Sequence, residues 1–374
     1  MISEPNTATV TRFESIVSAP APAKIRYIAS FDGLRGIAVT LLMLVHGSYG
    51  YFGGGVPRVD LFYMMSGFLI TYLLYYEFHT TGDIAFGKFY TRRALRIIPA
   101  LIVCIILSNI LWTYSELRPG NDQLMATLSS LFFFSNLVFE DVLGNMNHLW
   151  SLSVEEHFYF IWPAITFFIL FKLPDRKRIA FLCVLLACIE FFRVINYAYK
   201  DEWRWGMFWI DPYGFTFCRI DCILIGALLF FVLYRDKFNN GAPAKSPYDN
   251  LLLIGLGLIF MISAMTIKLV DARWLSGGFV LSNMLCAFTV LLTLRNPNHP
   301  ILAHKVLVWL GKRSYGIYLY HMSIFIYMER FRVHHSFTNF VIVTFFRFAV
   351  AIAFAALSYE FIERPILEYK KKYK

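Results

Sequence analysis

An arginine and a histidine share one face of the first long apolar segment of the chain. Residues 31–52 read FDGLRGIAVTLLMLVHGSYGYF, in which Arg35 and His46 stand 11 positions apart. Eleven residues of an α-helix make about three turns and rise roughly 16 Å. The two side chains therefore lie on one wall, with His46 well inside. A guanidinium binds phosphate and an imidazole can take a proton at neutral pH, so the pair fits an elongated ligand with an anionic head and a reactive tail.

Three arginines precede a second apolar segment, in the run FGKFYTRRALRIIPA at residues 86–100. Arg92 and Arg96 are four positions apart and share a helix face, Arg93 lies between them, and Tyr90 stands beside them. Arginines beside a membrane span often only anchor its orientation. Three together also form a phosphate clamp. We predict that Arg35, Tyr90, Arg92, Arg93 and Arg96 bind the anionic head of a donor on the cytoplasmic side.

Two adjacent carboxylates begin another apolar segment, in the run NHLWSLSVEEHFYFIWP at residues 147–163. Glu155 and Glu156 point about 100° apart on a helix, so one can face a cavity while the other meets head groups or a cation. We expect them on the outer side, away from the arginines, where one of them orients His46 or helps to hold an acceptor. The same run places His148, Trp150 and Ser151 at the start of the span.

Smaller elements are assigned to substrate binding or to structure. Ser66, Gly67 and Phe68 form a small-residue break that suits close helix packing. Arg219 and Asp221 stand at a helix start, and we expect them to pair with each other or with a glutamate. His321 ends the run SYGIYLYH, whose tyrosines suit core packing. The six cysteines show no paired CxxC spacing, and we expect neither a metal site nor a permanently bound cofactor.

The elements that position these residues are membrane helices. The chain of 374 residues is 58% hydrophobic and only 16% charged, which exceeds the apolar content of soluble domains. Ten segments have about the 20 apolar residues that a span needs: 34–52, 59–78, 97–117, 149–171, 179–199, 218–234, 250–269, 276–294, 308–329 and 339–361. We predict an all-α polytopic membrane protein with about ten transmembrane helices.

The distribution of basic residues predicts the orientation of this bundle. Lys and Arg gather in alternate connections, such as 79–96 and 172–178, and in the lysine-rich end of the chain. The positive-inside rule then places both termini in the cytoplasm, and it explains the net charge of +10 without a nucleic-acid partner. The apolar stretch 124–140 is only seventeen residues long, and we interpret 118–148 as an outer loop that does not cross. The predicted parts are a disordered cytoplasmic tail at 1–30, a membrane domain at 31–366 and a basic tail at 367–374.

These motifs, in this order, resemble those of the acyltransferase-3 family of membrane acyltransferases. The resemblance covers roughly residues 30–366 and rests on the Arg35 and His46 spacing, the Ser66–Gly67–Phe68 element, the FYxRRxxRIxP run at 89–99, the WSLxxEExFY run at 150–159, the Arg219 and Asp221 pair and the SYGIYLxH run ending at His321. It implies an acyl-CoA co-substrate, usually acetyl-CoA, and a sugar hydroxyl of a bacterial cell-surface or secreted glycan as acceptor. It also implies a multi-pass protein of the inner membrane, here a stand-alone member without a fused SGNH domain.

The resemblance and the residues together predict one mechanism. The arginines hold the CoA head, the arm of the donor runs along the Arg35 face, and His46 is the general base for the sugar hydroxyl, assisted by Glu155 or Glu156. A lipid-linked sugar flippase would also keep charged residues in its helices. A non-enzymatic anchoring protein is the third possibility. Measured turnover of acyl-CoA separates the first possibility from the second, and the effect of replacing His46 separates it from the third.

Overall fold

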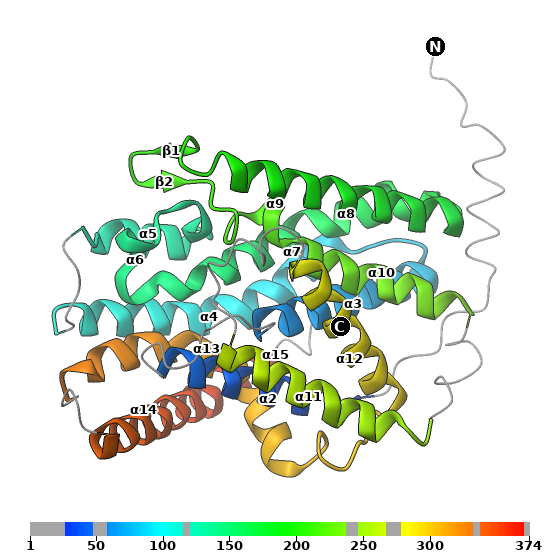
Figure 1. Cartoon of the computed structure of the whole chain (residues 1–374). Helices are drawn as coiled ribbons and strands as arrows, with labels where there is room; N and C mark the ends of the chain where they lie inside the picture. The colour runs from blue at the N-terminus through cyan, green and yellow to red at the C-terminus, as the bar shows by residue number, and fades with distance from the viewer. Residues whose placement is uncertain are drawn as a thin grey trace.

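The described part of the chain is almost entirely helical. The computed structural model describes residues 27–47, 58–114, 120–236, 246–266, 278–331 and 337–369. Its only strands in these ranges are β1 (Arg204–Trp205) and β2 (Phe208–Trp209), an antiparallel hairpin in which Arg204 faces Trp209. The predicted all-α class is confirmed (Figure 1). Most of the predicted tails at 1–30 and 367–374 lies outside the described residues.

Each of the ten predicted spans overlaps one helix of the described chain, although the bounds differ and parts of the predicted spans lie outside the described residues. These helices are α2 (Ala29–Gly47), α3 (Arg58–Thr81), α4 (Phe86–Trp112), α7 (Trp150–Phe168), α8 (Asp175–Ala198), α10 (Asp221–Asp236), α11 (Asp249–Thr266), α12 (Phe279–Arg295), α13 (Lys305–Tyr327) and α14 (Phe337–Ser358). Short elements join or extend them: α5 (Gln123–Leu131), η1 (Ser135–Leu137), α6 (Glu140–Leu143), η2 (Gly144–Leu149), η3 (Leu170–Lys172), α9 (Thr216–Arg219), η6 (Met328–Phe331), η7 (Tyr359–Glu363) and α15 (Arg364–Tyr369).

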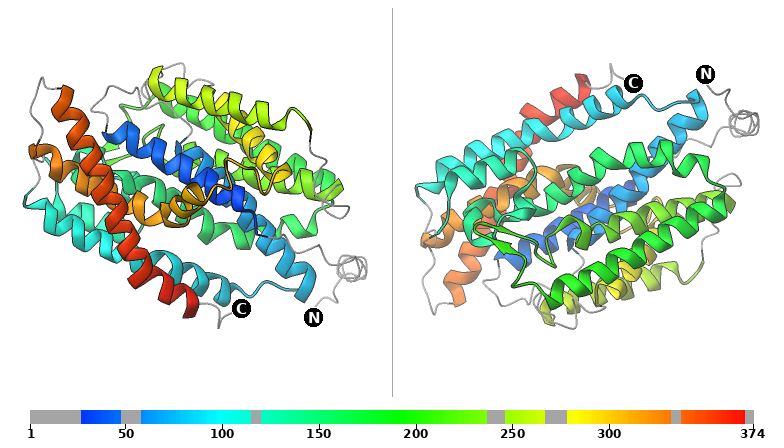
Figure 2. Two further views of the ribbon diagram at one scale, coloured as in Figure 1. Left: turned by 90° about the horizontal axis from the view of Figure 1, so that it is seen from below. Right: turned by 90° about the horizontal axis from the view of Figure 1, so that it is seen from above.

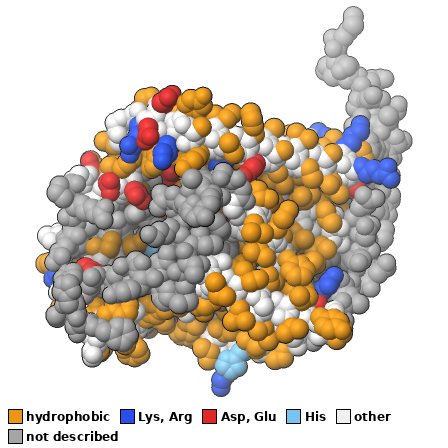
Figure 3. All heavy atoms as spheres, in the orientation of Figure 1, with side chains coloured by type: hydrophobic (Ala, Val, Ile, Leu, Met, Phe, Trp, Pro, Cys, Tyr) orange, Lys and Arg blue, Asp and Glu red, His pale blue; other side chains and the backbone are white. Residues whose placement is uncertain are grey.

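Six helical segments of the described chain are long and apolar enough to cross a membrane. They are Ala29–Gly47, Val59–Thr81, Phe86–Trp112, Glu140–Lys172, Asp175–Ala198 and Thr338–Tyr369. Asp221–Leu233, Asp249–Ser263 and Phe279–Arg295 are apolar but shorter. Large hydrophobic side chains such as Phe160 and Phe361 are exposed, and they cover much of the described surface in Figure 3. A surface of this kind suits contact with lipid.

Helices α2 and α13 run parallel and touch backbone to backbone. A Cβ on Gly36 would lie 2.4 Å from the carbonyl oxygen of Leu307, and one on Gly311 would lie 1.7 Å from that of Asp32. A side chain at either position would therefore push the helices apart. In both views of Figure 2 the blue α2 runs through the middle of the bundle. These two helices carry several of the residues of the site described below.

Helices α3 and α10 also run parallel and meet at glycine. A Cβ on Gly67 would lie 1.8 Å from the carbonyl oxygen of Ile223, and one on Gly226 would lie 2.2 Å from that of Met64. Close helix packing at the SGF element is thus confirmed for Gly67. The neighbouring Phe68 is fully buried, with its ring 6.2 Å from that of Phe31 and 5.9 Å from that of Phe230.

Helices α4 and α7 run antiparallel, which fixes the path of the chain between them. The ring of Phe86 lies 5.8 Å from that of Phe167, and the hydroxyl of Tyr90 donates to the carbonyl of Phe160 at 2.7 Å. The chain that leaves α4 therefore re-enters α7 at the same end of the bundle. The described residues between them form only short helices, α5, η1, α6 and η2. This arrangement agrees with the interpretation of 118–148 as a segment that does not cross.

Candidate active site

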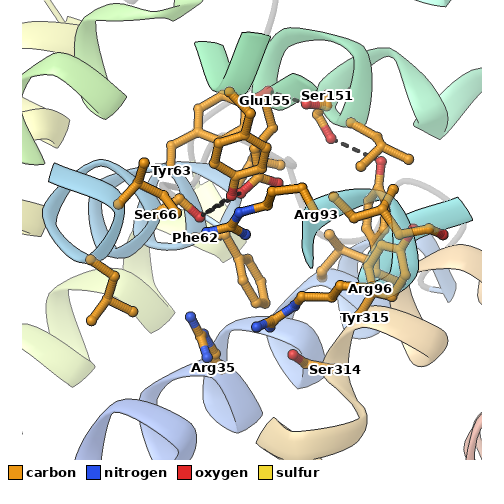
Figure 4. A pocket seen from close by; sticks show the side chains of 18 of the residues that line it. Arg35, Phe62, Tyr63, Ser66, Arg93, Arg96, Ser151, Glu155, Ser314 and Tyr315 are labelled. Carbon is orange, nitrogen blue, oxygen red and sulfur yellow. Dashed lines mark hydrogen bonds between the residues drawn. The ribbon is translucent and has the colours of Figure 1, made fainter. Parts of the chain in front are cut away.

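A cavity of about 240 Å³ lies between α2, α3, α4, α7 and α13. Three arginines, Arg35, Arg93 and Arg96, line it together with Ser314 and Tyr315, and Figure 4 shows their side chains around one cavity. The remaining lining includes the apolar side chains Leu42, Val59, Phe62, Leu69, Ile70, Leu73, Ile97 and Leu152. The cavity is thus mainly apolar with a concentrated positive charge. That is the composition expected for a small-molecule site that selects an anion.

The predicted arginine cluster divides into two parts. Arg93 and Arg96 line the cavity, whereas Arg92 forms an ion pair with Glu77 of α3 at an N–O distance of 3.2 Å. Tyr90 is held by its hydrogen bond to Phe160 and is not among the lining residues. The cavity face of α4 is therefore set by the i, i+3 spacing of Arg93 and Arg96, and of the i, i+4 pair that the sequence favoured only Arg96 faces the cavity. Arg35 lies 3.6 Å from Asp32 in α2.

Glu155 lines the same cavity as the arginines. Its carboxylate accepts hydrogen bonds from Ser66 of α3 and from Tyr159, one turn further along α7. The guanidinium of Arg93 lies 4.3 Å from the centre of the Tyr159 ring. The expected separation of carboxylates and arginines across the membrane is therefore wrong for Glu155. The two helices differ in length: α4 has 27 residues and α7 only 19, which correspond to about 40 Å and 28 Å. Because they run antiparallel, the first third of α4 overlaps the middle of α7.

Glu156 lies beside this group but is not among the residues that line the cavity. Its Oε1 atom is buried and accepts no hydrogen bond from the described residues. The pair therefore separates as expected for neighbours about 100° apart on a helix. Glu155 is the carboxylate that faces the cavity.

His46 contacts a second histidine at the far end of α13. Its Nδ1 lies 2.8 Å from Nε2 of His321, and Nδ1 of His321 lies 2.6 Å from the backbone carbonyl of Tyr318. A carbonyl oxygen can only accept, so Nδ1 of His321 carries the proton. In a neutral ring Nε2 must then accept the proton of Nδ1 of His46. Nε2 of His46 consequently holds the lone pair, as a general base requires. We had expected Glu155 or Glu156 to orient this ring; His321 takes that place.

Tyr318 connects this histidine pair to the cavity. Its side chain lines the cavity, and its hydroxyl lies 2.9 Å from that of Ser151 and donates to the carbonyl of His148 at 2.5 Å. Leu42, one turn before His46, also lines the cavity. Because α2 and α13 are parallel, the arginine end of the cavity and the histidine pair lie at opposite ends of the same two helices.

His148 and Trp150 support this end of the site from η2 and α7. The buried ring of His148 donates from Nε2 to the carbonyl of Leu319 at 3.0 Å and lies 5.1 Å from the ring of His321. Trp150 packs against Tyr213 with ring centres 5.0 Å apart. Ser151 also holds Tyr63, whose hydroxyl donates to its carbonyl at 2.8 Å.

Arg219 and Asp221 lie outside the cavity and do not pair with each other. Arg219 forms a buried ion pair with Asp60 of α3, and Asp221 forms one with Arg193 of α8 at 2.5 Å. Residues two apart on a helix do not face each other, which explains why the expected local pair does not form. Ser282 and Asn283 of α12 complete the network through Asp60 and Asp221. The network joins five helices, α3, α8, α9, α10 and α12, which is a structural role.

Sequence reasoning missed several polar residues of the site. Tyr318 and Tyr315 were assigned to packing, although both line the cavity. Tyr159 stands four positions after Glu155, a spacing that could have revealed the contact. Asp60 and Arg193 are charged residues in apolar helices, which is itself a signal. Within the described ranges no group of three or more His, Cys, Asp and Glu side chains has the geometry to hold a metal ion.

The family model and the similar proteins agree on one family for this chain. The model of the family Acyl_transf_3, described as an acyltransferase domain, matches residues 28–359. The chain is similar to "Putative O-acetyltransferase SACOL0978" of Staphylococcus aureus strain COL, with 31% identity over 367 residues, covering 91% of this chain and 58% of that protein. It is 28% identical over 361 residues to O-acetyltransferase OatA of Staphylococcus aureus strain NCTC 8325 / PS 47, covering 91% and 57%. The chain thus spans somewhat more than half the length of these relatives. No solved structure matches the chain.

Proposed function

Because the chain belongs to the Acyl_transf_3 family of acyltransferase domains, we propose that it is a membrane O-acyltransferase. The donor is acyl-CoA, with acetyl as the acyl group, and the acceptor is a hydroxyl of a cell-surface or secreted glycan sugar. The names of the relatives, O-acetyltransferases, support the acetyl group. We place the protein in the inner membrane of a bacterium.

One observation supports the proposal: a cavity lined by a cluster of arginines lies beside a pair of hydrogen-bonded histidines, His46 and His321, which are not themselves among its lining residues. Arg35, Arg93 and Arg96 line it, and Tyr318 and Leu42 lead from it to His321 and His46. The separation of Arg35 and His46 along α2 is about 16 Å. An acyl-CoA has the matching form, with phosphates at one end and a thioester at the end of a flexible arm.

The chain's own residues supply the chemistry in this proposal. The arginines bind the phosphates of the donor, and the positive charge is fixed in place by the contacts of Arg35 with Asp32 and of Arg93 with Tyr159. Glu155 positions Tyr159 and offsets part of this charge. The donor arm then lies along the apolar walls of the cavity toward His46.

Transfer follows from the lone pair on Nε2 of His46. The imidazole removes the proton of the sugar hydroxyl while the oxygen attacks the thioester carbonyl. The new C–O bond forms, the C–S bond breaks, and the proton held by His46 passes to the leaving thiolate. The products are the sugar ester and free CoA. His321 accepts a hydrogen bond from the Nδ1–H group of His46 throughout the reaction. This hydrogen bond keeps the His46 ring oriented and stabilises the transient imidazolium.

We propose ten membrane crossings with both termini in the cytoplasm. Alternating crossings make the first and ninth helices parallel, the second and sixth parallel, and the third and fourth antiparallel. The directions of α2 with α13, α3 with α10, and α4 with α7 support this count. The basic connections 79–96 and 172–178 favour the cytoplasmic placement.

The test is acetyl transfer by the purified protein in lipid vesicles. With radiolabelled acetyl-CoA outside and an extract of cell-surface glycans as acceptor, we expect label in the glycan and free CoA in equal amounts. His46→Ala should lower the rate by about 10²–10⁴-fold, the usual contribution of a general base. His79→Ala, near the C-terminal end of α3 and not among the residues that line the cavity, is the matched control. Movement of glycan across the vesicle without consumption of acetyl-CoA would instead identify a flippase.

A further inference from the structure

A second, smaller cavity of about 70 Å³ lies where the β1–β2 hairpin meets the start of α7. The hairpin is fixed there by a backbone hydrogen bond from Phe139 to Met207 at 2.9 Å and by the bridge between Val138 and Phe208. Trp150 lines this cavity, while the next residue, Ser151, lines the reaction cavity. The first turn of α7 therefore separates the two spaces.

Three aromatic rings line this cavity, together with the apolar side chains of Val138 and Leu143. The rings are those of Trp150, Tyr213 and Trp209. The first two hold each other with ring centres 5.0 Å apart and planes at 59°, and the indole N–H of Trp209 donates to the carbonyl of Lys200 at 3.0 Å. Arg204 packs on the Trp209 ring at 4.9 Å. Rings held in this way offer a rigid apolar surface with polar tips, which suits a ligand that has both C–H faces and hydroxyl groups.

The polar part of the cavity includes Asn136, which has an acceptor atom without a partner among the described residues. Asn136 is 4% exposed, and its amide nitrogen donates to the hydroxyl of Thr216 at 2.9 Å. Its Oδ1 atom is buried and accepts no hydrogen bond from any described residue. Buried polar atoms are nearly always paired, so the missing partner of this oxygen, in a residue that lines the cavity, points to a hydrogen-bond donor on a bound ligand.

Carboxylates complete the lining. Asp211 accepts a hydrogen bond from the backbone of Gly214 at 2.8 Å, and Glu140 is an exposed lining residue. The described lining holds neither Lys nor Arg, which disfavours a phosphate or another anion. The combination of acceptors and aromatic rings favours a neutral molecule rich in hydroxyl donors.

We propose that this cavity is a subsite for one neutral sugar ring of the acceptor glycan. The ring's hydroxyl edge enters between Asn136 and Asp211, and its apolar face rests on Trp150. About five water-sized groups fit in the available space, enough for the hydroxyl edge of one pyranose. The identification of the sugar as an acceptor rests on the proposed function. The binding of a sugar here does not.

The test is direct binding to the full-length purified protein. The probes are the methyl glycosides of glucose, galactose, mannose and N-acetylglucosamine. Their binding is measured by saturation-transfer NMR. We expect saturable magnetisation transfer to at least one probe. The affinity for that probe should be at least tenfold lower in Trp150→Leu and in Asn136→Ala. Trp309→Phe is the matched control, because this tryptophan packs on Arg313 in α13 away from both cavities. Glu140→Gln, at an exposed residue, is the variant that tests the site if a buried substitution does not fold.

Two outcomes distinguish the subsite from the proposed function. Saturable transfer that depends on Trp150, in a protein that never consumes acetyl-CoA, would retain the subsite and refute the acyltransferase. Acetyl transfer by a protein that binds none of the four probes, or that binds them equally well in all folded variants, would overturn the subsite. In the expected case the variants raise the KM for glycan by a larger factor than the KM for acetyl-CoA.

Discussion

Replacing His321 by leucine should lower kcat for acyl transfer by about two orders of magnitude without changing the KM for acetyl-CoA. His321 is fully buried, it accepts the Nδ1 proton of His46 at 2.8 Å, and it is itself held by the carbonyl of Tyr318 at 2.6 Å. Leucine keeps an apolar side chain at this position but cannot accept a hydrogen bond. Of the arginines proposed to bind the donor, Arg35 lies about three turns from His46 along α2, and Arg93 and Arg96 lie in α4, so we expect their contacts to be unaffected.

The size of the effect follows from the hydrogen bond that is lost. A hydrogen bond is worth about 0.5–1.5 kcal/mol net, and leaving a fully buried donor without its partner costs about 1–3 kcal/mol, of which the partly buried Nδ1 of His46 should show a part. A combined loss of about 2–3 kcal/mol corresponds to roughly 30–150-fold in rate at 1.36 kcal/mol for each factor of ten. The loss cannot exceed that of His46→Ala, because His321 acts only through His46.

The assay is a double-mutant cycle on acetyl transfer. His46→Ala with His321→Leu should be no slower than His46→Ala alone, since the second change removes a partner that is already gone. His321→Gln, whose amide oxygen can accept the same proton, should recover part of the rate. The pH profile of kcat should move in His321→Leu, because the tautomer and basicity of the remaining imidazole change.

A wild-type kcat in well-folded His321→Leu would refute the positioning role. So would a double variant whose losses add, because additive losses mean independent sites. Thermal unfolding and size-exclusion chromatography show whether the buried substitution is tolerated. His79→Ala controls for the loss of a partly buried histidine elsewhere in the same fold.

Three further predictions test the donor site, the topology and the second cavity. Arg93→Ala should raise the KM for acetyl-CoA at least tenfold, and this increase should grow with ionic strength. Arg92→Ala on the same helix should leave the KM for acetyl-CoA unchanged. Equal increases in the two variants would show that the arginines only fix topology. Cysteine at Asp141 should react with an impermeant reagent from outside and cysteine at Lys177 only from inside, and labelling of both from one side would disprove the proposed crossing of α7. Burial raises the pKa of Asp211 to about 6 from the usual 3.8, so its stabilising effect is complete below pH 3.8 and is lost as pH rises through 6. Relative to Asp211→Asn, the wild type should therefore lose up to about 3 kcal/mol of stability over that interval, and parallel pH curves would contradict the shift.

Sequence reasoning found the helices and the main chemical groups because both have local signals. Apolar length predicts a membrane helix wherever it occurs, and the 11-residue spacing of Arg35 and His46 is a property of one helix. The positions of these residues in α2 needed no tertiary information. The arginines at 93 and 96 and the carboxylate at 155 were found for the same reason, as costly charges in an apolar context.

The errors concern which side chains meet, and that is decided between helices. Arg92 and Arg93 differ by only about 100° around α4, so no local rule tells which of them faces the cavity and which faces Glu77. His321 lies 275 positions from His46, and only the parallel packing of α13 on α2 brings them together. Arg219 likewise pairs with Asp60, 159 positions away, rather than with its near neighbour.

The glycines of α2 and α13 show how packing far from the reaction can set its geometry. Gly36 and Gly311 allow the two backbones to touch near the arginine end, and because the helices are parallel this contact also fixes their relative register at the histidine end. A slip of one turn would shift α13 by about 5.4 Å, enough to break the 2.8 Å contact between His46 and His321. The same register holds Ser314 beside the arginine end of the cavity. The arginine end of the cavity and the histidine pair thus depend on the same two glycine contacts, so a larger side chain at Gly36 or Gly311 should disturb both together.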